Sequence, residues 1–261
     1  MKKTTILALS LISAGILGAT SVQAEENYPA KATTDATVIL EADNGAEDGE
    51  KPEGPGGGDG TDPGGEIDPE NPGGGVVDPG QTTSLRLSLL TAFDFGRIKI
   101  SGNTQNYTAK LPTPNFVGVG EKARPNFAQV TDNRGNNAGW TLTAKISDQF
   151  TNENRSSVLT GSTITLNNGW AQAQSTDNTA QPTVAKPVVL DEESDQLIAD
   201  AKENNGMGTW NILYGTLAEA DKGAKGDAAT SVHLTIPGSI KKTADEYKAK
   251  IQWTLSNTPT K

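Results

Sequence analysis

The stretch Tyr247-Lys-Ala-Lys-Ile-Gln-Trp253-Thr-Leu255 alternates apolar and polar residues without a break. Far earlier in the chain, Trp140-Thr-Leu142-Thr-Ala-Lys-Ile146 repeats its centre. Strict alternation is typical of a β-strand with one buried face. Both stretches are therefore predicted to be strands, and each Trp-Thr-Leu triplet should place its Trp and its Leu on the apolar face.

Residues 82–261 contain many more short alternating or β-branched stretches, separated by Gly, Asn and Pro. They begin near Ser84, Arg97, Asn106, Phe127, Thr163, Pro187, Thr209 and Ser231. This pattern predicts an all-β, antiparallel β-sandwich. One short helix is predicted over Ser194–Glu203, because a cap-type serine begins it and Asn205-Gly206 follows it.

The N-terminus has the features of a secretory signal. Lys2 and Lys3 precede a short apolar run, and small residues lead to Ala24. Residues 1–24 are predicted to be a signal peptide that is removed after Ala24. The apolar run is too short to favour a membrane anchor, and no other stretch is long and apolar enough to span a bilayer. The mature protein is therefore expected to be secreted, with no membrane span.

A linker is predicted over residues 42–81, which contain thirteen glycines and six prolines. Burying so few apolar groups cannot offset the entropy lost on ordering, so a disordered tether is expected. Its ends would lie roughly 35 Å apart on average. The acidity of the chain is concentrated in residues 25–81, which include this linker. They hold fifteen acidic and two basic side chains, a net charge of −13, whereas the whole chain carries −10.

Residues 25–41 form a short N-terminal segment with a strand candidate at Ala36–Glu41. Alone, such a strand is not stable. It is either disordered or docked on an edge of the main domain, and docking is favoured because the tether allows it to return. That domain, residues 82–261, is long enough for one substantial core. The chain has no cysteine, so the core must hold the fold without disulfides.

The sequence offers little support for catalysis. The only histidine, His233, is expected on the solvent side of its strand, and there is no Gly-x-Ser-x-Gly elbow. One His and no Cys argue against a zinc site, and no cofactor or nucleic-acid motif is present. Asp94, Asp132 and Asp148 lie near turns, where solvated carboxylates are the simpler interpretation. The protein is predicted not to be an enzyme, although a wall-active hydrolase with paired carboxylates stays open.

Five ordered segments resemble the WxL family of Gram-positive cell-surface proteins. They are Phe93-Asp-Phe95-Gly-Arg-Ile-Lys-Ile-Ser-Gly102, Gln129-Val-Thr-Asp-Asn-Arg-Gly135 with Gly139-Trp-Thr-Leu142, Gly206-Met-Gly-Thr-Trp210, Leu234-Thr-Ile-Pro-Gly238, and Trp253-Thr-Leu-Ser-Asn-Thr-Pro259. The resemblance covers about residues 82–261, with one small departure at Thr258, where a smaller residue is more usual.

The resemblance implies non-covalent attachment to the cell wall by binding of peptidoglycan. It also implies an extracellular, wall-associated location and partners among other secreted or membrane-tethered surface proteins, some with immunoglobulin-like domains. The family's motif positions correspond here to Trp140 and Leu142 in the proximal triplet and to Trp253 and Leu255 in the distal one.

Alternation leaves two interpretations of these four residues. A Trp among aliphatic neighbours is more often core than ligand platform, but one or both indoles in a groove could stack on sugar rings. The opposite strand faces carry Lys145, Lys248 and Lys250, which are either possible contacts to an anionic wall polymer or a solvated basic face. The competing function is a subunit of a surface complex, in adhesion or host interaction, that binds other wall proteins rather than the wall itself.

Overall fold

The structure is a computed structural model that describes residues 31–41, 71, 73–77, 79, 81, 83–116, 120–174, 180–217 and 226–259. The predicted signal peptide and most of the predicted linker lie outside these residues. Within the described ranges, no helix is long and apolar enough to cross a membrane.

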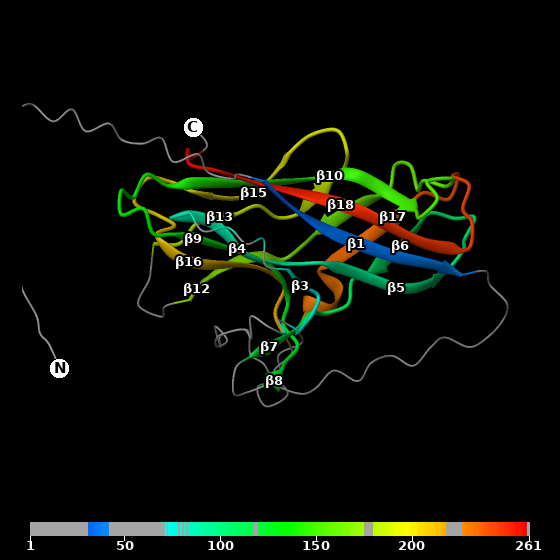
Figure 1. The fold of residues 1–261 in the computed structure, drawn as a ribbon, viewed down its shortest axis with the longest axis horizontal. Coiled ribbons are helices and arrows are strands. Elements are labelled where there is room, and N and C mark those ends of the chain that lie inside the picture. The colour runs from blue at the N-terminus through cyan, green and yellow to red at the C-terminus, as the bar shows by residue number, and fades with distance from the viewer. Residues whose placement is uncertain are drawn as a thin grey trace, which may run out of the picture.

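The largest sheet has six strands in the order β13-β15-β10-β18-β1-β5. These strands are β13 (Thr183–Val184), β15 (Gln196–Ala201), β10 (Trp140–Asn152), β18 (Asp245–Ser256), β1 (Lys31–Glu41) and β5 (Phe93–Lys99). All neighbours in this sheet are antiparallel except β1 and β5, which are parallel. In Figure 1 this sheet follows the long axis of the molecule.

Three smaller sheets complete the described fold. The five-stranded sheet contains β12 (Gly169–Ala173), β16 (Gly208–Tyr214), β9 (Asn126–Asp132), β4 (Leu85–Thr91) and β3 (Val76–Val77). The four-stranded sheet contains β14 (Val188–Leu190), β11 (Thr163–Leu166), β17 (Val232–Ile236) and β6 (Gln105–Thr108). The three-stranded sheet contains β2 (Gly73–Gly74), β7 (Thr113–Phe116) and β8 (Gly120–Glu121).

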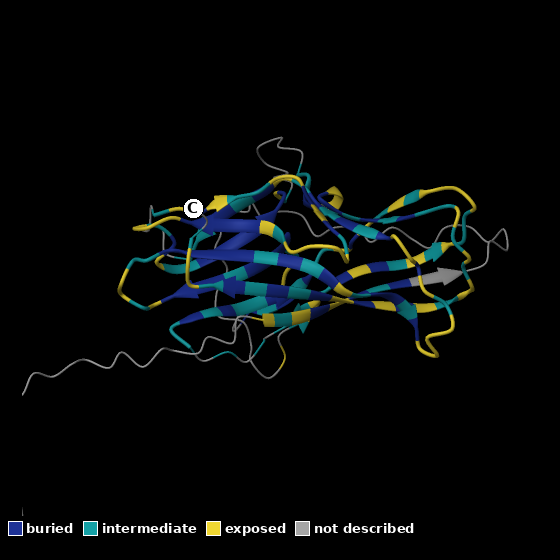
Figure 2. Cartoon of the chain, turned by 90° about the horizontal axis from the view of Figure 1, so that it is seen from above, coloured by how far each residue is buried: buried dark blue, intermediate teal, exposed yellow. Residues whose placement is uncertain are grey.

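A single apolar core connects the three larger sheets. Its buried members include Val38 from β1, Leu87 from β4, Phe150 from β10 and Leu234 from β17. Figure 2 shows buried and more exposed residues alternating along several strands. Alternation with one apolar face per strand is what two packed antiparallel layers require. The predicted all-β antiparallel architecture is confirmed.

The N-terminal strand β1 lies inside the six-stranded sheet, whereas the sequence suggested docking on an edge. It runs antiparallel to β18, with Ala36 opposite Ala249 and Val38 opposite Tyr247, and its other side pairs with β5. Ala36 and Val38 are fully buried. Because β18 and β5 both bond to β1, the large sheet is continuous only when this remote segment is in place.

The end of the predicted linker is part of the fold. Gly73–Gly74 pairs with β7, and Val76–Val77 pairs with Leu90 and Thr91 at the edge of the five-stranded sheet. Disorder extending to residue 81 is therefore wrong for residues 73–77. Val76 and Val77 supply two adjacent apolar, β-branched side chains, whereas the preceding linker residues offer only Ile67.

The predicted helix over Ser194–Glu203 is also wrong, because residues 196–201 form strand β15. This strand lies between β10 and β13 and buries Ile198, Ala199 and Ala201. Its pairing with the first half of β10 provides hydrogen-bond partners for the backbone N–H and C=O groups of the proximal Trp-Thr-Leu triplet. Tertiary pairing thus overrides a local helical preference. The helical element in the described residues is a single 3₁₀ turn, Ala228–Thr230.

Candidate functional site

The two Trp-Thr-Leu triplets lie side by side in the large sheet. In the antiparallel pairing of β10 with β18, Leu142 stands opposite Leu255, and Ala144 stands opposite Trp253. Trp140, Leu142 and Trp253 are 0% exposed, and Leu255 is 2% exposed. The structure therefore brings the four predicted motif residues together, and it places all of them in the core rather than on a surface groove.

The proximal indole has a fixed position. The Nε1–H of Trp140 donates a hydrogen bond of 3.0 Å to the backbone oxygen of Gly206. Gly206 has a φ of +77°, which L-residues with a side chain rarely adopt. A Cβ on Gly206 would overlap Trp140 Nε1 and the Cβ of Ala201. The glycine that starts the Gly206-Met-Gly-Thr-Trp210 segment is thus required by the packing of the proximal Trp.

Replacement of Gly206 by alanine is expected to lower the free energy of unfolding by about 2–3 kcal/mol, because it adds overlap to backbone strain. Gly135 is a matched control: its φ is +69°, and a Cβ there would meet nothing within 4 Å. Gly135→Ala should cost only the backbone strain, about 1 kcal/mol. Denaturant unfolding of both variants measures the difference, and equal losses would contradict the close approach.

The distal indole connects the motif to the N-terminal strand. The Nε1–H of Trp253 donates a hydrogen bond of 3.1 Å to Oγ1 of Thr34, which lies on β1 and is 1% exposed. A buried indole N–H without a partner would be costly, so this bond matters for stability. Nothing in the local sequence of either strand points to this contact, which spans the whole predicted linker.

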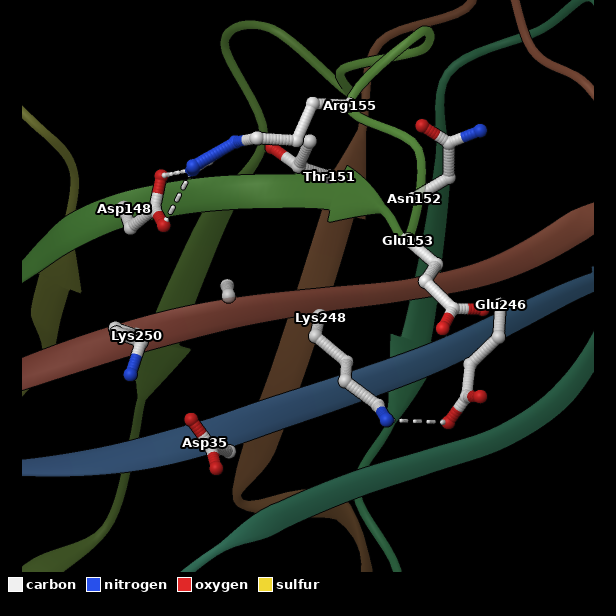
Figure 3. A pocket seen from close by; sticks show the side chains of 10 residues that line it. Asp35, Asp148, Thr151, Asn152, Glu153, Arg155, Glu246, Lys248 and Lys250 are labelled. Atoms are coloured by element: carbon white, nitrogen blue, oxygen red, sulfur yellow. Dashed lines mark hydrogen bonds and ion pairs between the residues drawn. The ribbon is translucent and has the colours of Figure 1, made fainter.

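The opposite face of the same strands carries a groove, hereafter the β18 groove. It encloses about 530 Å³. It is lined by Asp35, Asp148, Thr151, Asn152, Glu153, Arg155, Glu246, Lys248, Ala249 and Lys250 (Figure 3). Of the three predicted polymer contacts, Lys248 and Lys250 line the groove and are exposed. Lys145 does not line it. This half-buried residue precedes the groove residues of β10 and stands opposite Gln252 of β18.

The groove holds charges of both signs. Four carboxylate side chains and three cationic ones line it, so its formal charge is −4 + 3 = −1. Arg155 Nη2 contacts Asp148 Oδ1 at 2.9 Å and Oδ2 at 2.7 Å, and Lys248 Nζ lies 3.5 Å from Glu246 Oε1. Hydrogen bonding to Asp148, together with its negative charge, raises the pKa of Arg155. The lysines are therefore not part of a purely basic face.

Sequence reasoning had singled out Asp148 of this groove, but it missed Arg155 and the other three carboxylates, Asp35, Glu153 and Glu246. Asp35 arrives from β1, across the predicted linker, and stands opposite Lys250. Arg155 returns toward Asp148 because it lies in a turn with a φ of +51°. Neither placement has a local signature in the sequence.

Each of the three carboxylates considered for catalysis, Asp94, Asp132 and Asp148, forms an ion pair with a different basic side chain. Asp94 pairs with Lys110 at 2.8 Å, Asp132 pairs with Arg134 at 2.7 Å, and both side chains of the Asp132 pair are nearly fully buried. These two lie on β5 and β9, whereas Asp148 lies on β10 in the β18 groove.

The sole histidine is half-buried on β17, rather than fully open to solvent. Its Nε2 lies 2.8 Å from Nδ2 of Asn167. No group of three or more His, Cys, Asp or Glu side chains in the described part of the chain is arranged to hold a metal ion.

Comparison with known proteins gives one family. The sequence model of the WxL domain, described as a surface cell wall-binding domain, matches residues 27–259. No match was found among curated proteins or among solved structures. The family match begins before β1, which bonds to the distal Trp, and ends beyond β18, so it spans every strand described above. The chain belongs to the WxL domain family of surface cell wall-binding proteins.

Proposed function

We propose that the protein is a secreted, non-enzymatic component of a Gram-positive cell surface that attaches to the wall non-covalently by binding peptidoglycan. The observation that carries this proposal is the match to a cell wall-binding family over residues 27–259. That match includes β1, the segment on which the large sheet depends. Because the Trp-Thr-Leu residues are core, the contact with the wall is assigned to the outer surface of the domain.

A second function, as a subunit of a surface protein complex, is supported by a different observation. In the described residues, the most exposed large hydrophobic residues are Val158 at 40%, Val189 at 44%, Leu197 at 39% and Met207 at 37% exposure. None of them is aromatic, and aromatic faces are a common means of stacking on sugar rings. Attachment through another wall protein would not need such a platform.

A pull-down on purified sacculi separates the two functions. Direct binding predicts that the mature chain pellets equally well with sacculi that have been stripped of protein and with sacculi that have not. Attachment through a partner protein predicts pelleting with the unstripped sacculi only. The supernatant should contain no released muropeptides, whereas their appearance would contradict the non-enzymatic assignment.

A further inference from the structure

We propose that the β18 groove binds a short zwitterionic peptide segment, of the chemical class found in the peptide stems of peptidoglycan. This inference rests on the proposed peptidoglycan binding and names the part of the polymer that is recognised. The inference follows from the arrangement of charges in the groove and from the hydrogen bonds that fix one of its sides. It also follows from the absence of a free backbone edge along the floor of the groove.

The floor of the groove presents charges that have no partner in the described residues. Lys250 stands between Asp35 on β1 and Asp148 on β10 in the strand register, yet no carboxylate lies within 4.0 Å of its Nζ. In the same described ranges, the side chains of Asp35 and Glu153 form no ion pair or hydrogen bond. Figure 3 shows Lys250 and Asp35 on neighbouring strands. One cation and two carboxylates are thus open to a ligand.

The side of the groove that β10 and its following turn form is held in place by hydrogen bonds. Asn152 is 4% exposed; its Nδ2 donates to Ser156 Oγ and Asp245 Oδ2, both at 3.0 Å, and its Oδ1 accepts from the Ser157 N–H at 2.9 Å. The turn that this network holds carries Arg155 back to Asp148. A groove whose side chains are already held in place loses less entropy when a ligand binds.

The ligand must be recognised by side chains, because the floor strand has no open edge. β18 is hydrogen-bonded to β1 on one side and to β10 on the other. Addition of a peptide as a further strand would need an unpaired edge. The groove therefore selects its ligand by charge rather than by strand pairing.

The charge pattern favours a zwitterion over the other wall polymers. An anionic polymer would meet four carboxylates against three cations, which gives a net repulsion. An uncharged glycan would leave Lys250, Asp35 and Glu153 without partners. A stem peptide carries both amino and carboxylate groups, so its carboxylate can pair with Lys250 while its ammonium pairs with Asp35 or Glu153.

Five variants of the mature chain test the site. Lys250→Gln and Asp35→Asn each remove one open charge, and Lys122→Gln and Asp195→Asn remove exposed charges that do not line the groove. The binding of free stem peptide is measured by NMR titration. Each groove variant should weaken binding about threefold, as expected for an exposed ion pair, and the controls should match the parent. Lys250→Glu should weaken binding about tenfold, because it adds repulsion.

Two further probes identify the ligand class. Glycan strands freed of peptide and a phosphate-containing anionic wall polymer should leave the amide signals of Lys248–Lys250 unchanged. Stem peptide should shift these signals, and the shifts should shrink at high salt. Stronger binding of either other polymer at the groove would overturn the zwitterion assignment.

The test distinguishes this inference from the proposed function. If the parent pellets with sacculi but stem peptide shifts no groove signals, the groove assignment is wrong and peptidoglycan binding stands. If the parent does not pellet with stripped sacculi, the proposed function fails, and the titration still decides whether the groove takes a zwitterionic peptide. Equal binding by Lys250→Gln, Asp35→Asn and the parent would overturn the inference.

Discussion

A chain that lacks residues 31–41 is expected to lose cooperative folding. This deletion removes β1 from between β18 and β5, exposes the core faces against which Ala36 and Val38 pack, and leaves the Trp253 indole N–H without Thr34. The expected loss is roughly 5 kcal/mol or more, which equals the whole stability of many domains. A thermal melt followed by tryptophan fluorescence should show no cooperative transition.

A synthetic peptide of residues 31–41 should restore the transition when it is added to the truncated chain, because β1 is joined to the rest of the fold through a long predicted linker. Stabilisation should rise with peptide concentration, as for any ligand of the folded state. The control peptide carries Val38→Asp, which places a charge in the core, and it should not restore folding. A cooperative melt of the truncated chain alone would contradict the central position of β1.

Replacement of Trp253 by alanine is expected to lower the free energy of unfolding by about 3–5 kcal/mol. The indole is 0% exposed, it packs on the inner face of the large sheet, and its N–H bonds to Thr34. Trp253→Phe should cost less, because a ring still fills most of the space. Denaturant unfolding of the two variants provides the comparison.

The matched control for Trp253 is another tryptophan. Trp170 lies on β12, at an edge of the five-stranded sheet, and is half-buried, with a hydrogen bond of 2.9 Å to Gly215. Trp170→Ala should therefore cost clearly less than Trp253→Ala. If the two losses were equal, or if Trp253→Ala unfolded like the parent, the core assignment of the motif would not stand.

Alternation in the sequence predicts most of the strands because it records which face of each one is buried. It correctly placed Trp253 and Leu255 on one face of β18 and Lys248 and Lys250 on the other. It could not show that β1 enters the sheet beside β18, because strand order depends on packing between remote segments. The error over residues 196–201 has the same origin. This short stretch has helical end signals, but it forms a strand because its backbone pairs with that of β10.

The candidate site was predictable only in part. Lys248 and Lys250 follow from the strand period, but the acidic residues around them arrive by register and turn geometry. Asp35 is brought by a strand from the far side of the predicted linker, and Arg155 by a turn residue with positive φ. Local sequence therefore indicated a basic face where the fold builds a groove of mixed charge.

The most direct test of the account is the binding of folded Trp253→Phe to protein-stripped sacculi, measured beside the parent at a temperature where both are folded. The motif is core, and we propose that the wall contact lies on the outer surface, so the bound fraction per folded molecule should equal that of the parent. If the folded variant stays in solution while the parent pellets, the Trp253 indole takes part in binding, and the assignment of the Trp-Thr-Leu motif to a purely structural role is contradicted.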